Sequence, residues 1–452
     1  MTQDEALAIL KTGANVFLTG EPGSGKSYTI NQYTRYLRSR GIEPAVTAST
    51  GIAATQIGGM TVHSWSGIGI KGTLNKYDLD KISSTEYIVR RVQRAKVLII
   101  DEVSMLPPET LSMVDVVCRE IRQSEDAFGG LQVILVGDFF QLPPILKNNR
   151  QSHSQISLIE KPVERFAYDS PAWKKANFMT CYLTEQHRQD DKKFFSLLTA
   201  IRENNFDSSH LRQIEKRKKE PADVAKITPK LYTHNADVDR VNDGMLSKII
   251  SKTVEYKMES RGSRALVDSL KRGCLSPEVL ALKVGAEVMF TKNNQKEGFV
   301  NGTLGRVVGF DDLTRLPIIR KRDGDEIKVD TMDWMVEERG SARATITQLP
   351  LRLAWAITVH KSQGVSLDEA VMDLSQVFEF GQGYVALSRV RRLKGLHLLG
   401  WNERTFQVHP DVFVEDKGFR ASSEAALEVF GKLTEEEMVK LQSDFVTICG
   451  GI

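Results

Sequence analysis

A glycine-rich loop near the start of the chain has the residue types and the spacing of a phosphate-binding site. It reads GEPGSGKS from Gly20 to Ser27, and it follows the short apolar run VFL at residues 16–18. Glycines let successive backbone N–H groups converge on phosphate oxygens, and a helix that begins near Lys26 adds the positive end of its dipole. Lys26 can then reach the β- and γ-phosphates, while the Ser27 hydroxyl can ligate Mg²⁺. A plain turn between a strand and a helix is the alternative, but the full pattern favours a nucleoside triphosphate site.

An acidic pair ends a second apolar run and supplies groups that hydrolysis of a phosphate bond requires. The run KVLII at residues 96–100 leads directly into Asp101 and Glu102, so a buried parallel strand would deliver both carboxylates to the sheet edge beside the phosphate loop. Asp101 can hold Mg²⁺ through water, and Glu102 can orient or deprotonate the attacking water. Gln141 follows the apolar run at residues 131–136 and could sense the γ-phosphate from the side. A surface turn is the alternative for the acidic pair.

Buried parallel strands must position these residues. Four apolar runs separated by helical stretches predict a helix-covered parallel sheet over roughly residues 1–180. Residues 255–340 differ, because short segments separated by glycines predict a small antiparallel barrel, with a hairpin turn at Gly324. Parallel-sheet segments resume at residues 370–374, and the last fifty residues are acidic and helical in pattern.

The composition is that of a soluble globular protein with two or three domains. The chain has 452 residues, 41% of them hydrophobic and 26% charged, and no apolar run approaches the roughly 18 residues of a membrane span. The first ten residues lack the pattern of a signal peptide, so we expect a cytoplasmic protein, associated with the nucleoid if the source is bacterial. Four scattered cysteines make disulfides and structural zinc unexpected.

The net charge of +3 hides an uneven distribution. Residues 401–452 carry ten acidic and five basic side chains, which leaves a net charge of +8 on the first 400 residues. A mildly basic body is compatible with nucleic acid, but an ordinary solvated surface explains the charge equally well.

Ten sequence blocks in a fixed order resemble the motif series of the PIF-family DNA helicases, in the RecD-like branch of superfamily 1. They span residues 16–395, and ten blocks in order are far more specific than one phosphate loop. The resemblance implies two RecA-like motor domains that sandwich ATP, with single-stranded DNA crossing their top. The blocks are GEPGSGKS, VTASTGIAA, GGMTVHSWSGIG, IIDEVSM, GDFFQLPP, LTEQHRQ, LKVGAEVMF, VNGTLG, AWAITVHKSQGVSLD and GQGYVALSRV.

The resemblance implies an α/β fold with two RecA-like parallel-sheet motor domains. We expect a small wedge insertion in the first motor and a small β-barrel insertion in the second. The expected boundaries are 1–60 and 89–180 for the first motor, 61–88 for the wedge insertion, 181–254 and 341–400 for the second motor, 255–340 for the β-barrel insertion, and 401–452 for an acidic C-terminal tail.

Roles for five catalytic residues are implied by the same resemblance. Lys26 binds the phosphates, Glu102 acts on the attacking water, and Gln141 couples hydrolysis to DNA movement. Arg188 in LTEQHRQ and Arg389 in GQGYVALSRV resemble two arginine fingers contributed by the second motor. Such arginines stabilise transition-state charge only when the cleft closes, which makes hydrolysis depend on domain position. Outside these motifs, a lone arginine would be read as a surface ion-pair partner.

The nucleotide and metal contacts implied by the resemblance gather around the phosphate loop. ATP is the expected nucleotide, and Mg²⁺ is the expected metal, held by Ser27 and Asp101. Gln3 resembles the adenine-reading glutamine that precedes the first strand in related helicases, although a helix-surface glutamine fits its position nearly as well. The implied nucleotide-binding set is Gln3, Gly23, Ser24, Gly25, Lys26, Ser27, Tyr28, Gln141, Arg188, Gly364 and Arg389.

DNA contacts are implied in both motor domains. Hydroxyls, amides and backbone N–H groups on loops grip phosphates without reading sequence, whereas an aromatic ring such as Trp65 could stack on a base. Core packing is the alternative for Trp65. A wedge that parts the strands is expected around residues 67–84. The implied contacts are Thr50, Gly51, His63 and Trp65 in the first motor and Thr233, His234, Asn235, His360, Lys361 and Ser362 in the second.

The resemblance thus predicts an ATP-dependent DNA helicase that moves 5′ to 3′ on single-stranded DNA and separates forked duplex DNA. We expect it to act as a monomer, in DNA repair, recombination or telomere maintenance. The residues do not decide whether its biological target is a replication fork, an RNA–DNA hybrid or a G-quadruplex.

Three other classes of protein share parts of the pattern. A small-molecule kinase gives no reason for HKSQG or GQGYVALSR, and a regulatory P-loop switch gives none for two arginines placed to close over a nucleotide. An RNA helicase is the hardest rival, since motors that grip the backbone differ subtly in their response to the 2′-hydroxyl. ATPase rates in buffer, with single-stranded DNA and with single-stranded RNA would separate these classes.

We predict that Lys26→Ala abolishes ATP turnover and leaves the fold intact. The lysine places a point charge at the β- and γ-phosphates and makes no predicted core contact. Its removal should therefore weaken stabilisation of the transition state and not the fold. Circular dichroism checks the fold and a steady-state ATPase assay checks turnover, both on the same sample. A folded variant with near-normal turnover would refute the nucleotide-site assignment.

Overall fold

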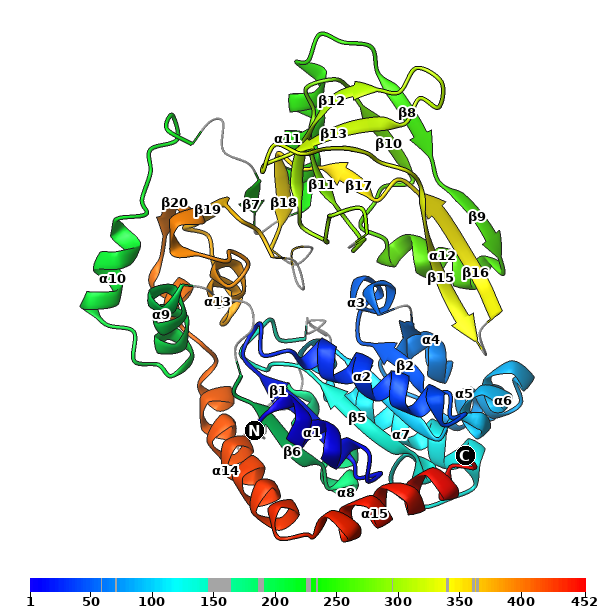
Figure 1. The fold of residues 1–452 in the computed structure, drawn as a ribbon. Helices are drawn as coiled ribbons and strands as arrows, with labels where there is room; N and C mark the ends of the chain where they lie inside the picture. The colour runs from blue at the N-terminus through cyan, green and yellow to red at the C-terminus, as the bar shows by residue number, and fades with distance from the viewer. Residues whose placement is uncertain are drawn as a thin grey trace, which may run out of the picture. The chain divides into compact units, whose positions relative to one another are not determined.

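The computed structural model describes residues 1–57, 59–69, 71–144, 164–185, 191–224, 229–232, 235–294, 296–338, 341–359, 362 and 366–452. They form two compact units (Figure 1). The first comprises Met1–Thr50, Gly59–His187 and Val414–Ile452, and the second comprises Gly51–Gly58 and Arg188–Phe413. None of the helices in this described part combines the length and the apolar composition that a membrane crossing needs.

A six-stranded parallel sheet in the order β3-β2-β4-β5-β1-β6 forms the centre of the first unit. Its central strands are runs of Val, Ile, Leu and Phe that are buried along almost their whole length, as expected for strands of a parallel sheet covered by helices. The strands are β1 Val16–Gly20, β2 Ala45–Ala48, β3 Met60–Thr61, β4 Val97–Asp101, β5 Gln132–Val136 and β6 Met179–Leu183.

Five helices of the first unit, α1, α4, α5, α8 and α15, begin at a residue whose side chain caps the helix. Thr2 and Glu5 form a capping box, with the Glu5 N–H donating to the Thr2 hydroxyl (3.2 Å) and the Thr2 N–H donating to the Glu5 carboxylate (2.7 Å), which fixes the start of α1 at Gln3. Residues 61–88, predicted as a wedge insertion, fold mainly as α4, α5 and the start of α6, which pack against α7. The helices are α1 Gln3–Leu10, α2 Lys26–Ser39, α4 Val62–Ser66, α5 Lys76–Ser83, α6 Glu86–Arg94, α7 Pro108–Arg122, α8 Pro171–Ala176 and α15 Glu435–Ile448, with 3₁₀ turns at Val103–Met105, Ala127–Gly130 and Ala167–Asp169.

The last forty residues complete the core of the first unit. Helix α14, Pro410–Gly431, enters this unit from Val414 onward, and α15 follows it along the outside of the unit (Figure 1). Phe445 and Val446 of α15 join the cluster of buried apolar side chains that includes Val16 and Leu18 of β1. The acidic C-terminal segment is therefore packed onto the sheet that carries the phosphate loop.

A four-stranded parallel sheet in the order β18-β7-β19-β20 forms the centre of the second unit, so the predicted α/β class with two parallel sheets is confirmed. The strands are β7 Lys230–Tyr232, β18 Ala356–Thr358, β19 Ala370–Leu374 and β20 Leu396–Trp401. The accompanying helices are α3 Gly51–Gln56, α9 Lys192–Arg202, α10 Ser208–Glu215, α11 Asn235–Ser247 and α13 Gln382–Leu387, with 3₁₀ turns at Leu393–Gly395 and Glu403–Phe406.

Antiparallel strands interrupt this unit between α11 and β18, as the segments separated by glycines predict. Gly324, with φ of 99°, lies in the turn that joins β13 to β14, which confirms the predicted hairpin. Five strands pair in the order β14-β13-β12-β11-β17 around a core that includes Phe290 and Trp355. The elements are β8 Val254–Lys257, β9 Glu259–Gly262, α12 Arg264–Gly273, β10 Val279–Leu282, β11 Glu287–Phe290, β12 Leu304–Phe310, β13 Pro317–Lys321, β14 Glu326–Lys328, β15 Met332–Glu338, β16 Ser341–Gln348 and β17 Leu351–Leu353.

Candidate nucleotide-binding and hydrolysis site

The phosphate loop has a backbone that only glycine adopts readily. Gly20, Gly23 and Gly25 have φ of 143°, 93° and 89°, which are values that L side chains rarely adopt. A Cβ on Gly25 would lie 2.0 Å from Nε2 of Gln3, and a Cβ on Gly20 would lie 2.6 Å from the carbonyl oxygen of Leu183. Helix α2 begins directly after Gly25, so the loop and the first turn of the helix form a cradle that side chains would fill.

Two polar side chains of the loop fit a bound triphosphate. Nζ of Lys26 donates to the carbonyl oxygens of Gly20 (2.7 Å) and Glu21 (3.1 Å), so the ammonium group lies over the loop. Oγ of Ser24 is fully buried and has no hydrogen-bond partner among the described residues. Buried polar groups are normally paired, so an unpaired hydroxyl beside an ammonium and a helix N-terminus is suited to phosphate oxygens.

The acidic pair lies at the end of β4, as the sequence predicts. Burial raises the pKa of the Asp101 carboxyl, and two groups oppose this shift: the Glu102 N–H, which donates to Oδ1 of Asp101 at 2.8 Å, and the positive charge of Lys26. Lys26 is therefore close enough to act electrostatically on Asp101. A divalent cation beside this carboxylate would favour its ionised form further.

Ser49 holds the backbone of the acidic pair, a role that no local sequence pattern indicates. Its hydroxyl donates to the carbonyl oxygen of Glu102 at 2.6 Å, and its N–H donates to the carbonyl oxygen of Asp101 at 3.0 Å. Glu102 has φ of 54°, a left-handed conformation that costs energy for a residue with a side chain. Two hydrogen bonds from the end of β2 thus stabilise the conformation that aims Glu102.

Gln141 lies on the loop after β5, and Asp138 organises that loop. The N–H of Phe140 donates to Oδ1 of Asp138 at 3.2 Å, and Nε2 of Gln141 donates to Oδ2 at 3.4 Å. Gln141 is 7% exposed and Asp138 is fully buried. The predicted γ-phosphate sensor is therefore held by a carboxylate from its own loop.

Gln3 contacts the phosphate loop directly. Its Nε2 donates to the carbonyl oxygen of Ser24 at 3.1 Å, and its backbone N–H donates to Oε2 of Glu185 at 3.0 Å. These contacts disfavour the helix-surface alternative. The adenine contact itself stays a prediction.

Arg389 follows the end of α13 in the second unit and is buried, with 2% of its surface exposed. Its guanidinium donates to the carbonyl oxygen of Val385 (2.8 Å), to Oγ of Ser388 (2.8 Å) and to the carbonyl oxygen of Ser362 (3.4 Å). The predicted arginine finger is thus tied to the segment that contains the predicted DNA contacts HKS. Its catalytic role stays a prediction.

The structure weighs against two of the predicted DNA contacts. Trp65 is 2% exposed, which fits the core-packing alternative and leaves no ring face for a base. Ser362 is fully buried, and its hydroxyl donates to the carbonyl oxygen of Val359 at 2.7 Å, so the hydroxyl is already satisfied. His63 is partly buried, and burial lowers the pKa of its imidazole, so it would meet a phosphate mainly as a neutral group.

The remaining predicted contacts lie at or next to the start of a helix, or outside the described residues. Thr50 is partly buried, and Gly51 begins α3, which groups with the second unit and packs against α12. Asn235 begins α11, but its side chain is outside the described part. Also outside it are Arg188, Thr233, His234, His360, Lys361 and Gly364.

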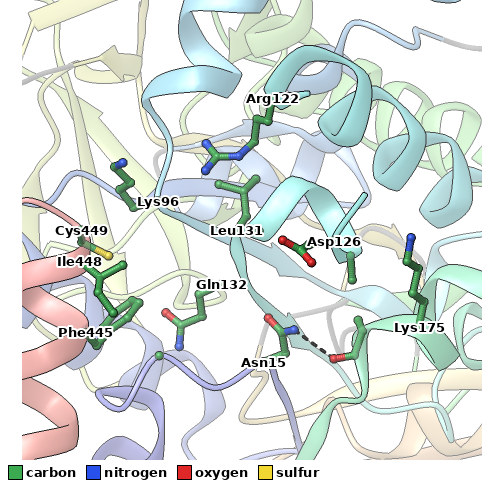
Figure 2. Close-up of a pocket in the computed structure, with 14 residues that line it drawn as sticks. Asn15, Lys96, Arg122, Asp126, Leu131, Gln132, Lys175, Phe445, Ile448 and Cys449 are labelled. Atoms are coloured by element: carbon green, nitrogen blue, oxygen red, sulfur yellow. Dashed lines mark hydrogen bonds between the residues drawn. The ribbon is translucent and has the colours of Figure 1, made fainter. Parts of the chain in front are cut away.

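A cavity of about 400 Å³ lies at the opposite edge of the first sheet, where β4 and β5 begin (Figure 2). Several of its polar side chains serve the fold: Nε2 of Gln132 donates to the carbonyl oxygens of Leu10 and Ala14, and Nδ2 of Asn15 donates to that of Ala176 at 3.0 Å. Arg122 donates to the carbonyl oxygen of Gly129 at 2.5 Å. These groups are already satisfied, so the cavity does not compete with the phosphate loop as a nucleotide site.

A phosphate loop after one parallel strand, a carboxylate pair after another and a glutamine after a third define a P-loop nucleoside triphosphatase. The sequence profile of the PIF1-like helicase family matches residues 4–212, and that of the 2B domain of DNA helicase Pif1 matches residues 265–310. The chain belongs to the PIF1-like helicase family, and the predicted enzyme class, an ATP-hydrolysing DNA helicase, is confirmed.

Individual relatives are similar to this chain over nearly its whole length. The ATP-dependent DNA helicase Pif1 of a Psychrobacter species is 39% identical over 100% of this chain and 75% of its own length. The protein of the same name from Bdellovibrio bacteriovorus is 35% identical over 91% of this chain and 90% of its own length. The crystal structure of Pif1 from a Bacteroides species in complex with ADP-AlF4 has a TM-score of 0.80 at 30% identity, with 93% of this chain and 96% of that chain covered.

We predict that Glu102→Gln retains ATP binding and lowers the rate of hydrolysis by about a hundredfold or more. The amide keeps the shape of the side chain and removes the base, while the phosphate ligands remain. A fluorescent ATP analogue measures binding, and steady-state ATPase measures turnover. Glu109→Gln, at an exposed position in the first turn of α7, is the matched control and should behave like the wild type. Equal losses of affinity and hydrolysis in Glu102→Gln would instead make it a metal ligand or a structural residue.

Proposed function

We propose that the chain uses ATP hydrolysis to move 5′ to 3′ along single-stranded DNA and so separates the strands of forked duplex DNA. The observation that carries the proposal is the convergence of Lys26, the acidic pair and Gln141 at one edge of the first sheet. Similar solved structures support the substrate: one is Bacteroides Pif1 bound to single-stranded DNA (TM-score 0.63), and another concerns unwinding of forked duplex DNA by two coordinating Pif1 helicases (TM-score 0.61).

In the proposed hydrolysis step, the chain supplies charge and orientation. Lys26 exchanges its carbonyl contacts for the β- and γ-phosphate oxygens, where its charge opposes the charge that develops on the transferred group. Glu102 orients the attacking water and accepts its proton. Gln141 contacts the γ-phosphate from the neighbouring loop. The buried hydroxyl of Ser24 gains an acceptor when phosphate oxygens enter the cradle.

Mg²⁺ fits the same edge of the sheet, with Ser27 and Asp101 as the residues that would hold it. The ion would neutralise phosphate charge when it is bound. Asp101 is suited to this role because it ends β4, at the edge of the sheet where β1 leads into the phosphate loop.

Coupling to DNA is proposed to run through the second unit. Arg389 and Arg188 act as fingers that stabilise transition-state charge when the two units close on ATP. The hydrogen bond from Arg389 to the backbone of Ser362 supports this role, because it links the finger to the HKSQG segment within one unit. DNA contacts at Thr50, at His63 and in the HKSQG segment would then couple DNA binding to hydrolysis.

Further substrates follow from the same chemistry. A motor that grips the backbone does not read bases, so RNA–DNA hybrids and G-quadruplex DNA are candidate obstacles for it to remove. Such an activity would suit DNA repair, recombination and telomere maintenance. Both units belong to one chain, so a monomer is proposed as the translocating species.

Forks with a single tail test the proposal. We expect strand separation when the tail is 5′ and none when it is 3′, and stronger ATPase stimulation by single-stranded DNA than by RNA. Binding to single-stranded DNA should weaken by about 0.7 log unit per log unit of salt for each phosphate neutralised, with little sequence preference. If strands separate only when the tail is 3′, the direction of movement is 3′ to 5′ and the proposed direction is wrong. Stronger ATPase stimulation by RNA would favour the RNA helicase alternative.

We predict that Arg389→Ala binds single-stranded DNA normally but loses DNA-stimulated hydrolysis by about a thousandfold, together with unwinding. The finger acts only in the closed state, so binding is spared. Arg391→Ala removes a half-exposed arginine that pairs with Asp368 in the same segment, and it serves as the control. Because Arg389 is buried, thermal unfolding must accompany the assay. Normal unwinding by a folded Arg389→Ala would contradict the two-domain motor.

A further inference from the structure

Helix α14 places Phe419 in a cluster of aromatic rings that includes residues of β1 and of the loop after β5. The ring of Phe419 is 4.9 Å from that of Phe17 in an edge-to-face contact and 6.0 Å from that of Phe139 in a stacked one, measured between centroids. Only 8% of Phe419 is exposed. We call this group the aromatic cluster; its members are Phe17, Phe139, Phe166, Tyr168, Trp173 and Phe419.

The two rings that Phe419 joins belong to segments that carry the site. Phe17 is the second residue of β1, the strand that runs into the phosphate loop at Gly20. Phe139 is 4% exposed and stands between Asp138 and Gln141, in the loop that presents the predicted γ-phosphate sensor. One side chain of the C-terminal segment therefore packs against residues of two segments that carry the site, β1 and the loop after β5.

Polar contacts hold α14 in the position from which Phe419 reaches the cluster. The Tyr182 hydroxyl donates to Oδ1 of Asp416 (3.0 Å) and accepts from Nη2 of Arg420 (2.8 Å), while Nε of Arg420 donates to Oδ2 of Asp416 (2.7 Å). The Tyr182 N–H, on the edge strand β6, donates to Oγ of Ser423 at 3.0 Å. Residues 416, 419, 420 and 423 share one helix face, so the polar contacts and the aromatic contact are made together.

We propose that Phe419 is a positioning residue for ATP hydrolysis, and that α14 is a structural part of the motor. The ring of Phe419 packs against Phe139 and so holds Gln141 at the distance from the γ-phosphate that hydrolysis requires. The inference rests on the proposed function, since it assumes that Gln141 acts on the γ-phosphate. Neither family profile that matches this chain extends to α14.

Removing the ring should slow the chemical step and spare nucleotide binding. Phe419→Ala leaves the phosphate loop and Lys26 in place, so the KM for ATP should stay within about twofold. Loss of support under Phe139 lets the sensor loop shift, and a misplacement on the order of 1 Å can cost about a hundredfold in rate. We expect kcat of the DNA-stimulated ATPase to fall by between about tenfold and a hundredfold. Phe419→Leu, which keeps most of the apolar volume, should recover part of the lost kcat.

The full-length chain is assayed with single-stranded DNA below the unfolding temperature of every variant. Phe430→Ala is the matched control, because Phe430 lies on the same helix and packs against the other core cluster of this unit, away from the aromatic cluster. It should lose stability and retain kcat. Phe139→Ala combined with Phe419→Ala should be no slower than the slower single variant, because both act through one contact.

Gln141→Ala separates failure of the inference from failure of the proposed function. If Gln141→Ala hydrolyses ATP normally, the sensor role fails and the inference fails with it. If Gln141→Ala is slow while Phe419→Ala has normal kcat, or if Phe419→Ala and Phe430→Ala lose kcat equally, only the inference is overturned. If Phe419→Ala does not fold, Phe419→Leu decides: a reduced kcat at unchanged KM supports the proposal, and a normal kcat overturns it.

Discussion

Parallel pairing of buried strands is the constraint on which the site depends. Leu18 of β1 pairs with Val136 of β5, and Ile99 of β4 pairs with Ile134 of β5, so three strands run side by side with their carboxyl ends at one edge. The segments that leave this edge must therefore lie together. Burial of these apolar runs is what brings a lysine, two carboxylates and a glutamine from distant parts of the sequence into one site.

The same edge gathers polar groups that suit a phosphate and a cation. Burial raises the pKa of Asp101, the ammonium of Lys26 rests on backbone carbonyls, and the Ser24 hydroxyl is buried without a partner among the described residues. Each of these conditions improves when phosphate oxygens and a cation enter. The fold thus places an ammonium group, a carboxyl group and a buried hydroxyl where phosphate oxygens and a cation would bind.

The C-terminal segment packs against the edge strand and the core of the first unit. Ser423 accepts from the outer N–H of Tyr182 on the edge strand β6, which covers an edge that could otherwise pair with another chain. Phe445 contributes to the core below β1. An acidic segment that looks separable from the motor by charge is therefore built into the first unit by packing.

Local patterns in the sequence determined the phosphate loop, the acidic pair, four of the six strands of the first sheet and the hairpin at Gly324. Each of these depends on neighbouring residues: glycines that permit a left-handed backbone, or an apolar run long enough to mark a buried strand. The motif series added the family. Strand β3 has only two residues and β6 is less uniformly apolar, so neither carries such a pattern.

Only the tertiary structure decided which side chains meet across these elements. Trp65 reads equally well as a stacking ring or a core residue until its burial is known, and Ser49 has no local signal for its hydrogen bond to Glu102. A helical pattern over residues 410–431 likewise does not say that Phe419 will face Phe17 and Phe139. These contacts join residues far apart in the sequence, and long-range packing is set by the whole core and not by any one segment.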